Sequence, residues 1–114
     1  MTKVIAVPKD EDAMKALDFD QATDGQLSEL FLNDEDFKKL WTIGLFDSIN
    51  ELTGTLIDEY EDDNITDMSK LKLVLESSLL DEAKYSSELS LIISRIKDLF
   101  KEAQERGTGI FFYF

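Results

Sequence analysis

Residues 89–114 read LSLIISRIKDLFKEAQERGTGIFFYF and carry the clearest secondary-structure signals in the chain. Apolar residues recur every three or four positions through the first fifteen of them, which is typical of one face of an α-helix. Gly107 then predicts the end of the helix, because glycine readily adopts the left-handed conformation found there. The aromatic run from Ile110 to Phe114 predicts a strand. In a domain this small, we expect that strand to pack in the core rather than to pair with another chain.

The opposite end of the chain predicts a second strand. Lys3-Val-Ile-Ala-Val7 is rich in β-branched residues and stops at Pro8, the only proline in the sequence. Two strands alone make a marginal sheet, so we expect the terminal strands to pair with each other and to pack against helices. A third strand around residues 18–22 would extend such a sheet; alternatively, one edge stays open to a second chain.

The segment after the first strand predicts two helices separated by a loop. Asp10 to Leu17 suits a short helix, and Phe19 to Ala22 suits a loop. Thr23-Asp-Gly-Gln26 has the form of a capping box, with threonine at the N-cap and glutamine three residues later. We therefore expect a helix that starts here and continues through Leu27, Leu30 and Phe31.

A long helix is predicted in the middle of the chain. Asn33 suits its N-cap, and the three acids that follow lie where the positive end of the helix dipole favours them. Glycines weaken the pattern, and Gly44 permits a kink or a break. The helix is expected to end at residues 62–65. Its apolar positions are Phe37, Trp41, Leu45, Ile49, Leu52, Leu56 and Tyr60, spaced by three and four throughout.

One further helix completes the predicted architecture. Thr66 suits its N-cap, and its apolar face includes Met68, Leu71 and Val74. The chain is therefore expected to be α+β and mostly helical, with about four to five helices and short strands at the N- and C-termini that form a small sheet. No linker, repeat or low-complexity tract interrupts it, so residues 1–114 are expected to form a single domain.

The net charge of −13 is concentrated in the middle of the sequence. Residues 16–69 contain fifteen acids and only two bases, Lys38 and Lys39, whereas residues 1–15 and 70–114 are each balanced. Such an excess repels nucleic acid and anionic membranes, and it attracts basic partners over long distances. The charge therefore predicts a basic protein as partner, and neither nucleic acid nor a membrane.

Composition also bears on the compartment. The chain has no cysteine, which fits a reducing environment. The apolar run near the start, Val4 to Val7, is too short for a secretory signal, and no stretch approaches the ~20 apolar residues of a membrane span. We therefore expect a cytoplasmic protein.

Several kinds of catalytic or metal site are excluded by composition. The chain has no histidine and no cysteine, so the usual zinc sites and the Ser-His-Asp and Cys-His arrangements are missing. The five glycines match neither nucleotide-binding fingerprint. Residues 20–31 begin like a calcium loop, but Ala22 and Phe31 would occupy positions that must supply oxygen ligands. We therefore expect no catalytic residue, metal or cofactor, and a protein that is not an enzyme.

Acidic residues on the predicted long helix form the candidate binding surface. Asp47, Glu51, Asp58 and Asp62 are offset by four, seven and four residues, which would place them in one stripe opposite the apolar face. No base between residues 40 and 69 relieves the repulsion of like charges at helical spacing, which costs a few tenths of a kcal/mol per pair. The predicted partner-binding residues are Asp47, Glu51, Asp58, Glu59, Glu61, Asp62 and Asp63.

A simpler interpretation stands beside the functional one. Charge runs are usually solvated surface, so the same acids would then serve only solubility. Trp41 has a similar pair of interpretations: it lies at the margin of the apolar stripe, where packing in the core is favoured over an exposed binding anchor.

The acidic segment from Leu45-Phe-Asp-Ser-Ile-Asn-Glu-Leu52 through Asp58-Glu-Tyr-Glu-Asp-Asp63 resembles bacterial toxin-immunity proteins of the contact-dependent inhibition or bacteriocin type. The resemblance is one of general type over the middle of the chain, without a diagnostic motif. It implies a tight complex with a basic nuclease toxin, in which the acidic row blocks the active site or substrate groove. Two alternatives remain: a phage-type nucleic-acid mimic that inhibits a DNA-binding or restriction enzyme, and a structural or regulatory module.

Overall fold

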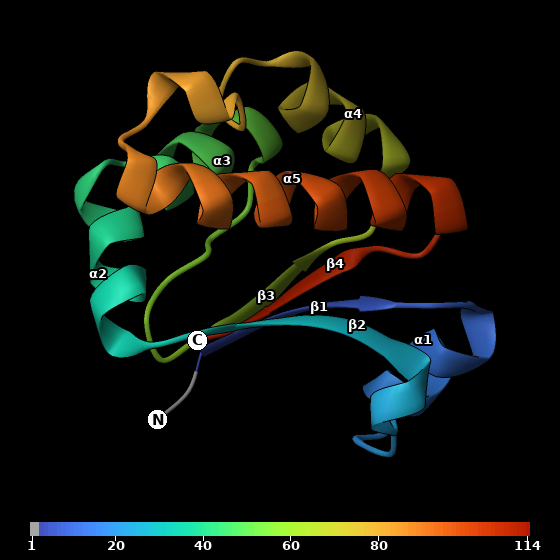
Figure 1. The fold of residues 1–114 in the computed structure, drawn as a ribbon. Helices are drawn as coiled ribbons and strands as arrows, with labels where there is room; N and C mark the ends of the chain where they lie inside the picture. Colours follow the sequence, from blue (N-terminus) through green and yellow to red (C-terminus); the bar gives the residue numbers. More distant parts are fainter. Residues whose placement is uncertain (1–2) are drawn as a thin grey trace.

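The computed structural model describes residues 3–114, which form an α+β fold that is mostly helical, as predicted (Figure 1). These residues contain five α-helices, a four-stranded antiparallel sheet and two 3-10 turns. In chain order the elements are β1 (Lys3–Pro8), α1 (Glu11–Asp18), η1 (Asp24–Gln26), β2 (Leu27–Leu32), α2 (Asp34–Thr42), α3 (Leu45–Thr53), β3 (Asp62–Ile65), α4 (Met68–Glu76), η2 (Glu82–Lys84), α5 (Ser87–Arg106) and β4 (Ile110–Tyr113).

The two terminal strands lie side by side at the centre of the sheet, whose strand order is β2-β1-β4-β3. Val4 pairs with Tyr113 and Ala6 with Phe111, in antiparallel register. The predicted pairing of the terminal strands is therefore confirmed. The two edge strands, β2 and β3, come from the acidic middle of the sequence, where helices were expected.

The prediction of a helix after Thr23 is wrong, because residues 27–32 form β2. Gln26 does reach back as in a capping box, since its side-chain oxygen accepts a hydrogen bond from the Thr23 amide at 3.1 Å, but this contact closes only one 3-10 turn. The sequence that follows, LSELFL, has the period of a strand: Leu30 and Leu32 are buried, whereas Phe31 between them is exposed. The third strand thus lies at 27–32 and not around 18–22.

The predicted long helix is also wrong, although its possible break at Gly44 is confirmed. Gly44 has a φ of 79° and separates α2 from α3. Gly54, with a φ of 72°, then ends α3, and both glycines hold the left-handed conformation that costs other residues free energy. Residues 62–65, expected to end the helix, instead form β3 at the edge of the sheet.

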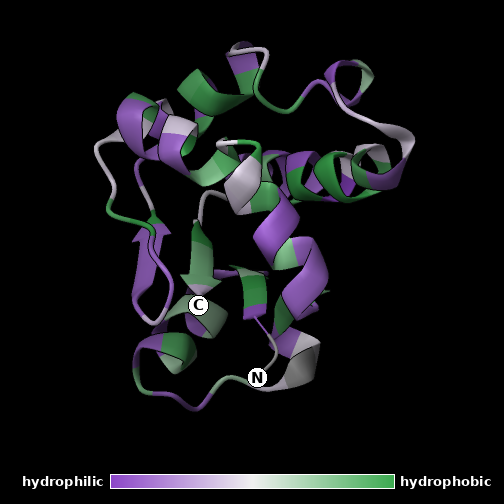
Figure 2. Ribbon diagram, turned by 90° about the vertical axis from the view of Figure 1, so that its left-hand side faces the viewer, coloured by the Kyte–Doolittle hydropathy of each residue, from purple (hydrophilic) through white to green (hydrophobic). Residues whose placement is uncertain are grey.

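The hydrophobic core lies between one face of the sheet and helices α2 to α5, while α1 lies against the other face (Figure 1). The helices show alternating hydrophilic and hydrophobic bands, as expected when one side of each covers a core (Figure 2). An aromatic cluster fills the end of the core near α2 and α3. Trp41 belongs to it, with ring centroids 5.1 Å from Phe46 and 6.1 Å from Phe37, so the expected packing of Trp41 against the core is confirmed.

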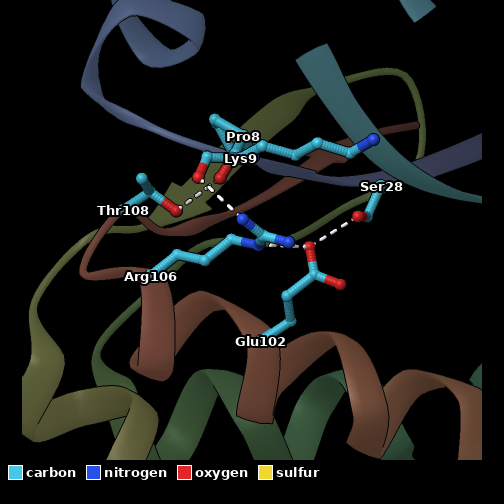
Figure 3. A network of polar contacts seen from close by, with 6 residues as sticks. All are labelled: Pro8, Lys9, Ser28, Glu102, Arg106 and Thr108. Carbon is cyan, nitrogen blue, oxygen red and sulfur yellow. Dashed lines mark hydrogen bonds and ion pairs between the residues drawn. The ribbon is translucent and has the colours of Figure 1, made fainter. Parts of the chain in front are cut away.

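A polar network closes the other end of the core, where α5 meets the sheet (Figure 3). Glu102 accepts hydrogen bonds from Ser28 of β2 and from Arg106, and Arg106 also donates to the carbonyl of Lys9 at 3.0 Å. The buried Thr108 hydroxyl donates to the carbonyl of Pro8 at 2.8 Å. These bonds fasten the end of α5 to β1 and β2.

Helix caps mostly follow the sequence signals. Asn33 caps α2 as predicted, accepting a hydrogen bond from the Asp36 amide at 2.8 Å. Asp67, and not Thr66, caps α4, accepting hydrogen bonds from the hydroxyl and amide of Ser69. These bonds lower the pKa of Asp67, because they stabilise its ionised form.

Phe100→Ala tests the role of α5 in the core. The Phe100 ring is fully buried, so its loss should lower the free energy of unfolding by about 3–5 kcal/mol. Urea unfolding followed by circular dichroism measures this loss. Leu91→Ala is the matched control on the same helix: Leu91 is 68% exposed, and a change beyond about 0.5 kcal/mol would contradict the placement of the core.

Candidate partner-binding surface

The seven predicted binding residues lie on three different elements. Asp47 and Glu51 are on α3, the next three acids are in the loop of residues 54–61, and the last two are on β3. The single acidic helical row is therefore wrong, because α3 ends at Gly54 and the chain turns away. Six of the seven are exposed and Asp63 is partly buried; the full set is Asp47, Glu51, Asp58, Glu59, Glu61, Asp62 and Asp63.

The structure brings three of these acids together around one groove of about 390 Å³. Asp47 of α3 lies on one side of it, and Asp58 and Glu61 of the loop lie on the other. Trp41, Asn50, Leu56 and Ile57 complete the lining. Glu59 lines neighbouring hollows together with Lys38. Asp62 lies elsewhere, beside Tyr113 on the sheet face that α1 partly covers.

Asn50 holds the 54–61 loop in its folded shape. Its side-chain oxygen accepts hydrogen bonds from the Ile57 amide and the Thr55 hydroxyl, both at 2.8 Å. Its side-chain nitrogen donates to the Ile57 carbonyl at 3.0 Å, so both backbone groups of this buried residue are satisfied. The Asn50 side chain thus serves as a template: its hydrogen bonds hold the loop in the shape that leads the chain back toward the sheet.

Asp63 and Lys3 fix the far end of the same loop. Asp63 accepts a hydrogen bond from the Leu56 amide at 2.8 Å, which gives it a structural part in the loop. Lys3, almost fully buried, donates to the carbonyl of Phe114 at 2.7 Å, and the amide of Tyr60 donates to the same oxygen at 3.0 Å. The Lys3 ammonium also lies 4.8 Å from the centre of the Tyr60 ring, a cation–π arrangement.

The loop carries two exposed apolar residues that the sequence pattern had assigned to the core face. Leu56 is 77% exposed and Tyr60 is 80% exposed, whereas their neighbour Ile57 is buried. Tyr60 also has a positive φ of 69°, an uncommon conformation for an aromatic residue. The prediction failed because the spacing of three and four continues by coincidence past the end of α3. Gly54 between two threonines was the local signal for the end of the helix.

Electrostatically, the loop surface is acidic, with Lys3 and Lys38 at its margin. Of the two lysines in the acidic middle, Lys39 pairs with Glu35 at 3.1 Å and with Glu88 at 3.4 Å, so α2 is bridged to α5. Lys38 instead lines the hollows that contain Asp58 and Glu59. Within residues 3–114, no group of three or more acids is arranged to hold a metal ion.

The indole of Trp41 forms part of the groove wall. Its N–H is buried and has no hydrogen-bond partner among the residues that the structure describes. Asp47, Asp58 and Glu61 line the same groove, which leaves Trp41 facing a negatively charged wall. The groove therefore combines an apolar and aromatic lining with three carboxylates.

Comparison of the chain with protein-family models, with curated proteins and with solved structures finds no match. Among residues 3–114, no helix has both the length and the apolar character needed to cross a membrane.

Asn50→Ala tests the template role of this side chain. It leaves both backbone groups of Ile57 without their partner, which should lower the free energy of unfolding by about 1–3 kcal/mol. Chemical unfolding measures the loss, and hydrogen exchange at the Ile57 amide should become faster. Glu51→Ala, an exposed site on the same helix, is the control. Equal effects of both substitutions would show that the loop does not depend on Asn50.

Proposed function

We propose that this chain is a binding protein that neutralises a basic protein partner, and specifically an immunity protein that blocks a cognate nuclease toxin. The observation that carries the proposal is the 54–61 loop. Leu56 and Tyr60 project from it. Leu56 lines a groove with Asp47, Asp58 and Glu61, and Tyr60 lines a neighbouring hollow with Glu59 and the lysines Lys3 and Lys38. The resemblance to toxin-immunity proteins, which rests on the same segment, is consistent with it.

Exposed apolar residues and the acidic residues around them contribute to different properties of an interface. Large apolar side chains at the centre of an interface supply most of the affinity once water is removed from them. Charges at the rim contribute mainly to the rate of association and to the rejection of wrong partners. The loop surface has both parts, and its backbone is held in advance by Asn50, which limits the entropy lost on binding.

The charge of the loop surface favours a basic partner of the nuclease class. A nuclease must attract phosphates, so its substrate groove carries lysines and arginines. Asp58, Glu59 and Glu61 would lie against such a groove and exclude the nucleic acid. Lys38 and Lys3 line the hollows beside these acids, and with Asp34 and Asp47 the acids that line the same hollows outnumber the bases.

The exposed apolar residues of the loop also distinguish the immunity-protein proposal from the two alternatives. A nucleic-acid mimic needs negative charges along a backbone-like path and has no need of exposed Leu56 and Tyr60 at their centre, so we place it second. A solvated face that serves only solubility would likewise not need them, because exposed apolar side chains reduce solubility. As an immunity protein the chain would act by binding and not as an enzyme, and it would act in the cytoplasm, which the lack of cysteine fits.

The proposal is tested by capture of a partner with the tagged chain at low and at high salt, with mass spectrometry and a nuclease assay on what is retained. We expect one basic nuclease, retained in near-stoichiometric amount, weakened by salt and inactive while bound. Because a toxin can come from a competing cell, lysates of neighbouring strains belong in the test.

Two sets of variants locate the interface on the loop. Leu56→Ser with Tyr60→Asn should raise the dissociation constant about 1,000-fold, since each anchor is worth about 2 kcal/mol and every ~1.4 kcal/mol is a factor of ten. Asp58→Asn, Glu59→Gln and Glu61→Gln together should slow association about tenfold at low salt. Glu76→Gln, Glu82→Gln and Glu105→Gln remove the same charge from exposed sites elsewhere and serve as the control. Equal losses in the test and control sets would refute the loop as the interface.

A further inference from the structure

A second surface lies on the face of the sheet opposite α2 to α5, and the proposed loop interface does not include it. On this outer face the strands carry cross-strand rows of side chains. Ala6 and Phe111 pair in one row and are buried, consistent with α1 packing against β1. The next row remains accessible to solvent. It runs across all four strands as Phe31, Val4, Tyr113 and Asp62.

The accessible row is more apolar than a solvated sheet face requires. Phe31 is 61% exposed, and it lies directly opposite Val4 in the register. Tyr113 is partly buried, and its ring is stacked beside that of Phe111 at 6.4 Å with an angle of 13° between the planes. Antiparallel sheets commonly leave one face to water, but that face is then polar. This row, with Phe31 exposed on it, is therefore a candidate surface for contact with another molecule.

Between this row and the end of α1 the surface is hollowed into a groove of about 510 Å³. Its apolar lining includes Val4, Leu17, Leu27 and Tyr113. A volume in this range, roughly 300–1,000 Å³, is typical of sites that hold a small ligand or a single side chain with its backbone. None of the residues that line this groove lines the groove of the 54–61 loop, so the two surfaces can be altered separately.

The rim of the groove is acidic. Asp20, Glu29 and Asp62 line it from three different elements, and no lysine or arginine of the described chain lines it. Asp18 stands nearby at the last residue of α1, where the negative end of the helix dipole disfavours an acid. Asp20 holds a positive φ of 55°, a conformation that aspartate adopts more readily than most residues.

This negative field also affects the pKa of the Tyr113 hydroxyl. Burial of the side chain is the main reason that the pKa of Tyr113 is raised to about 12. The carboxylates of Asp62, Asp18 and Asp20 add to this rise in pKa, because they oppose a further negative charge. The floor of the groove is therefore apolar and lies in a negative field.

We propose that this outer-face groove holds an arginine side chain of a partner protein. The apolar lining suits the aliphatic stem of arginine, which buries well while its charged head stays hydrogen-bonded. The planar guanidinium stacks on aromatic rings and presents donors in a fork that matches carboxylates on two sides. Tyr113, which lines the groove, provides the ring, and Asp20 and Asp62 provide carboxylates from two elements. A lysine ammonium, which is more strongly hydrated and not planar, fits this combination less well.

The test is a nuclear magnetic resonance titration of the whole chain with the capped tripeptide acetyl-Gly-Arg-Gly-amide. The same peptide with lysine, or with neutral citrulline, serves as the control for charge and shape. We expect saturable shifts of the Val4, Phe31 and Tyr113 amides, with the arginine peptide binding at least threefold more tightly than the lysine peptide. Citrulline should give no saturable shift. Equal affinity for arginine and lysine, or an equal response to citrulline, overturns the proposal.

Matched variants locate the site. Asp20→Asn with Asp62→Asn should weaken the arginine peptide at least fivefold, and asparagine tolerates the backbone conformation of residue 20. Glu82→Gln with Glu105→Gln removes the same charge elsewhere and should change the affinity less than twofold. Shifts confined to residues 54–61, or equal affinities for both double variants, would assign the peptide to general charge attraction and overturn the groove. The loop variants should leave this peptide titration unchanged, so the two proposals fail separately.

Titration of Tyr113 gives an independent prediction. Absorbance near 295 nm, taken as the difference between the unaltered chain and Tyr113→Phe, should show a transition at about pH 12, against about 10 for an unperturbed tyrosine. Asp62→Asn should lower this pKa, and saturating arginine peptide should lower it further. The stability linked to neutral Tyr113 is complete below pH 10 and is lost between about pH 10 and 12, because the unfolded chain ionises first. A transition at pH 10 that Asp62→Asn leaves unmoved would contradict the described field.

Discussion

The pairing of β1 with β4 is the contact on which the rest of the molecule depends. It joins the two ends of the described chain at the centre of the sheet, and Lys3 reinforces it by donating to the carbonyl of Phe114. Both strands come from segments with little net charge. The acidic segment between them supplies the two edge strands, α2, α3 and the 54–61 loop. The charge imbalance is thereby distributed over edges and loops, where water can solvate it.

This arrangement also avoids the repulsion between like charges that a single long helix would have imposed on the acidic residues. Asp58 to Asp63 on one helix would repel each other at helical spacing. In the structure these acids are divided between a loop and an edge strand, and two of them take on local tasks: Asp63 binds the Leu56 amide, and Asp58 accepts a hydrogen bond from the Glu59 amide. Acids on β3 also discourage pairing of this edge with other chains. Figure 2 shows the contrast between hydrophilic β3 and its hydrophobic neighbour β4.

The parts of the fold that could be predicted are those whose signals are long or local. Fifteen residues of helical periodicity predicted α5, and Asn33 predicted the start of α2, because a cap needs only its own turn. The edge strands were missed because β2 follows a turn that imitates a capping box, and β3 has four residues with only one apolar side chain buried. The path of the 54–61 loop depends on Asn50, whose contacts with Thr55 and Ile57 form only once the loop has folded back.

The candidate site likewise has a part that the sequence could predict and a part that depends on the folded chain. Exposure of Asp47, Asp58 and Glu61 could be anticipated from charge alone, but their meeting across one groove required the break at Gly54. Leu56 and Tyr60 were the residues that periodicity misplaced, and they are the ones that turn an acidic surface into a candidate interface. Phe31 was likewise assigned to the apolar face of a helix, whereas it lies on the strand β2 and is exposed to solvent.

Hydroxyl-radical footprinting of the chain with and without its captured partner tests the central claim most directly. In the free chain Tyr60 should be readily oxidised, because its ring is exposed. With the partner bound, oxidation of Tyr60 and Leu56 should fall strongly, while exposed Leu91 and Leu73 of the distant helices remain unchanged as internal references. Protection of Leu91 or Leu73 with Tyr60 still fully reactive would place the partner elsewhere and contradict the account.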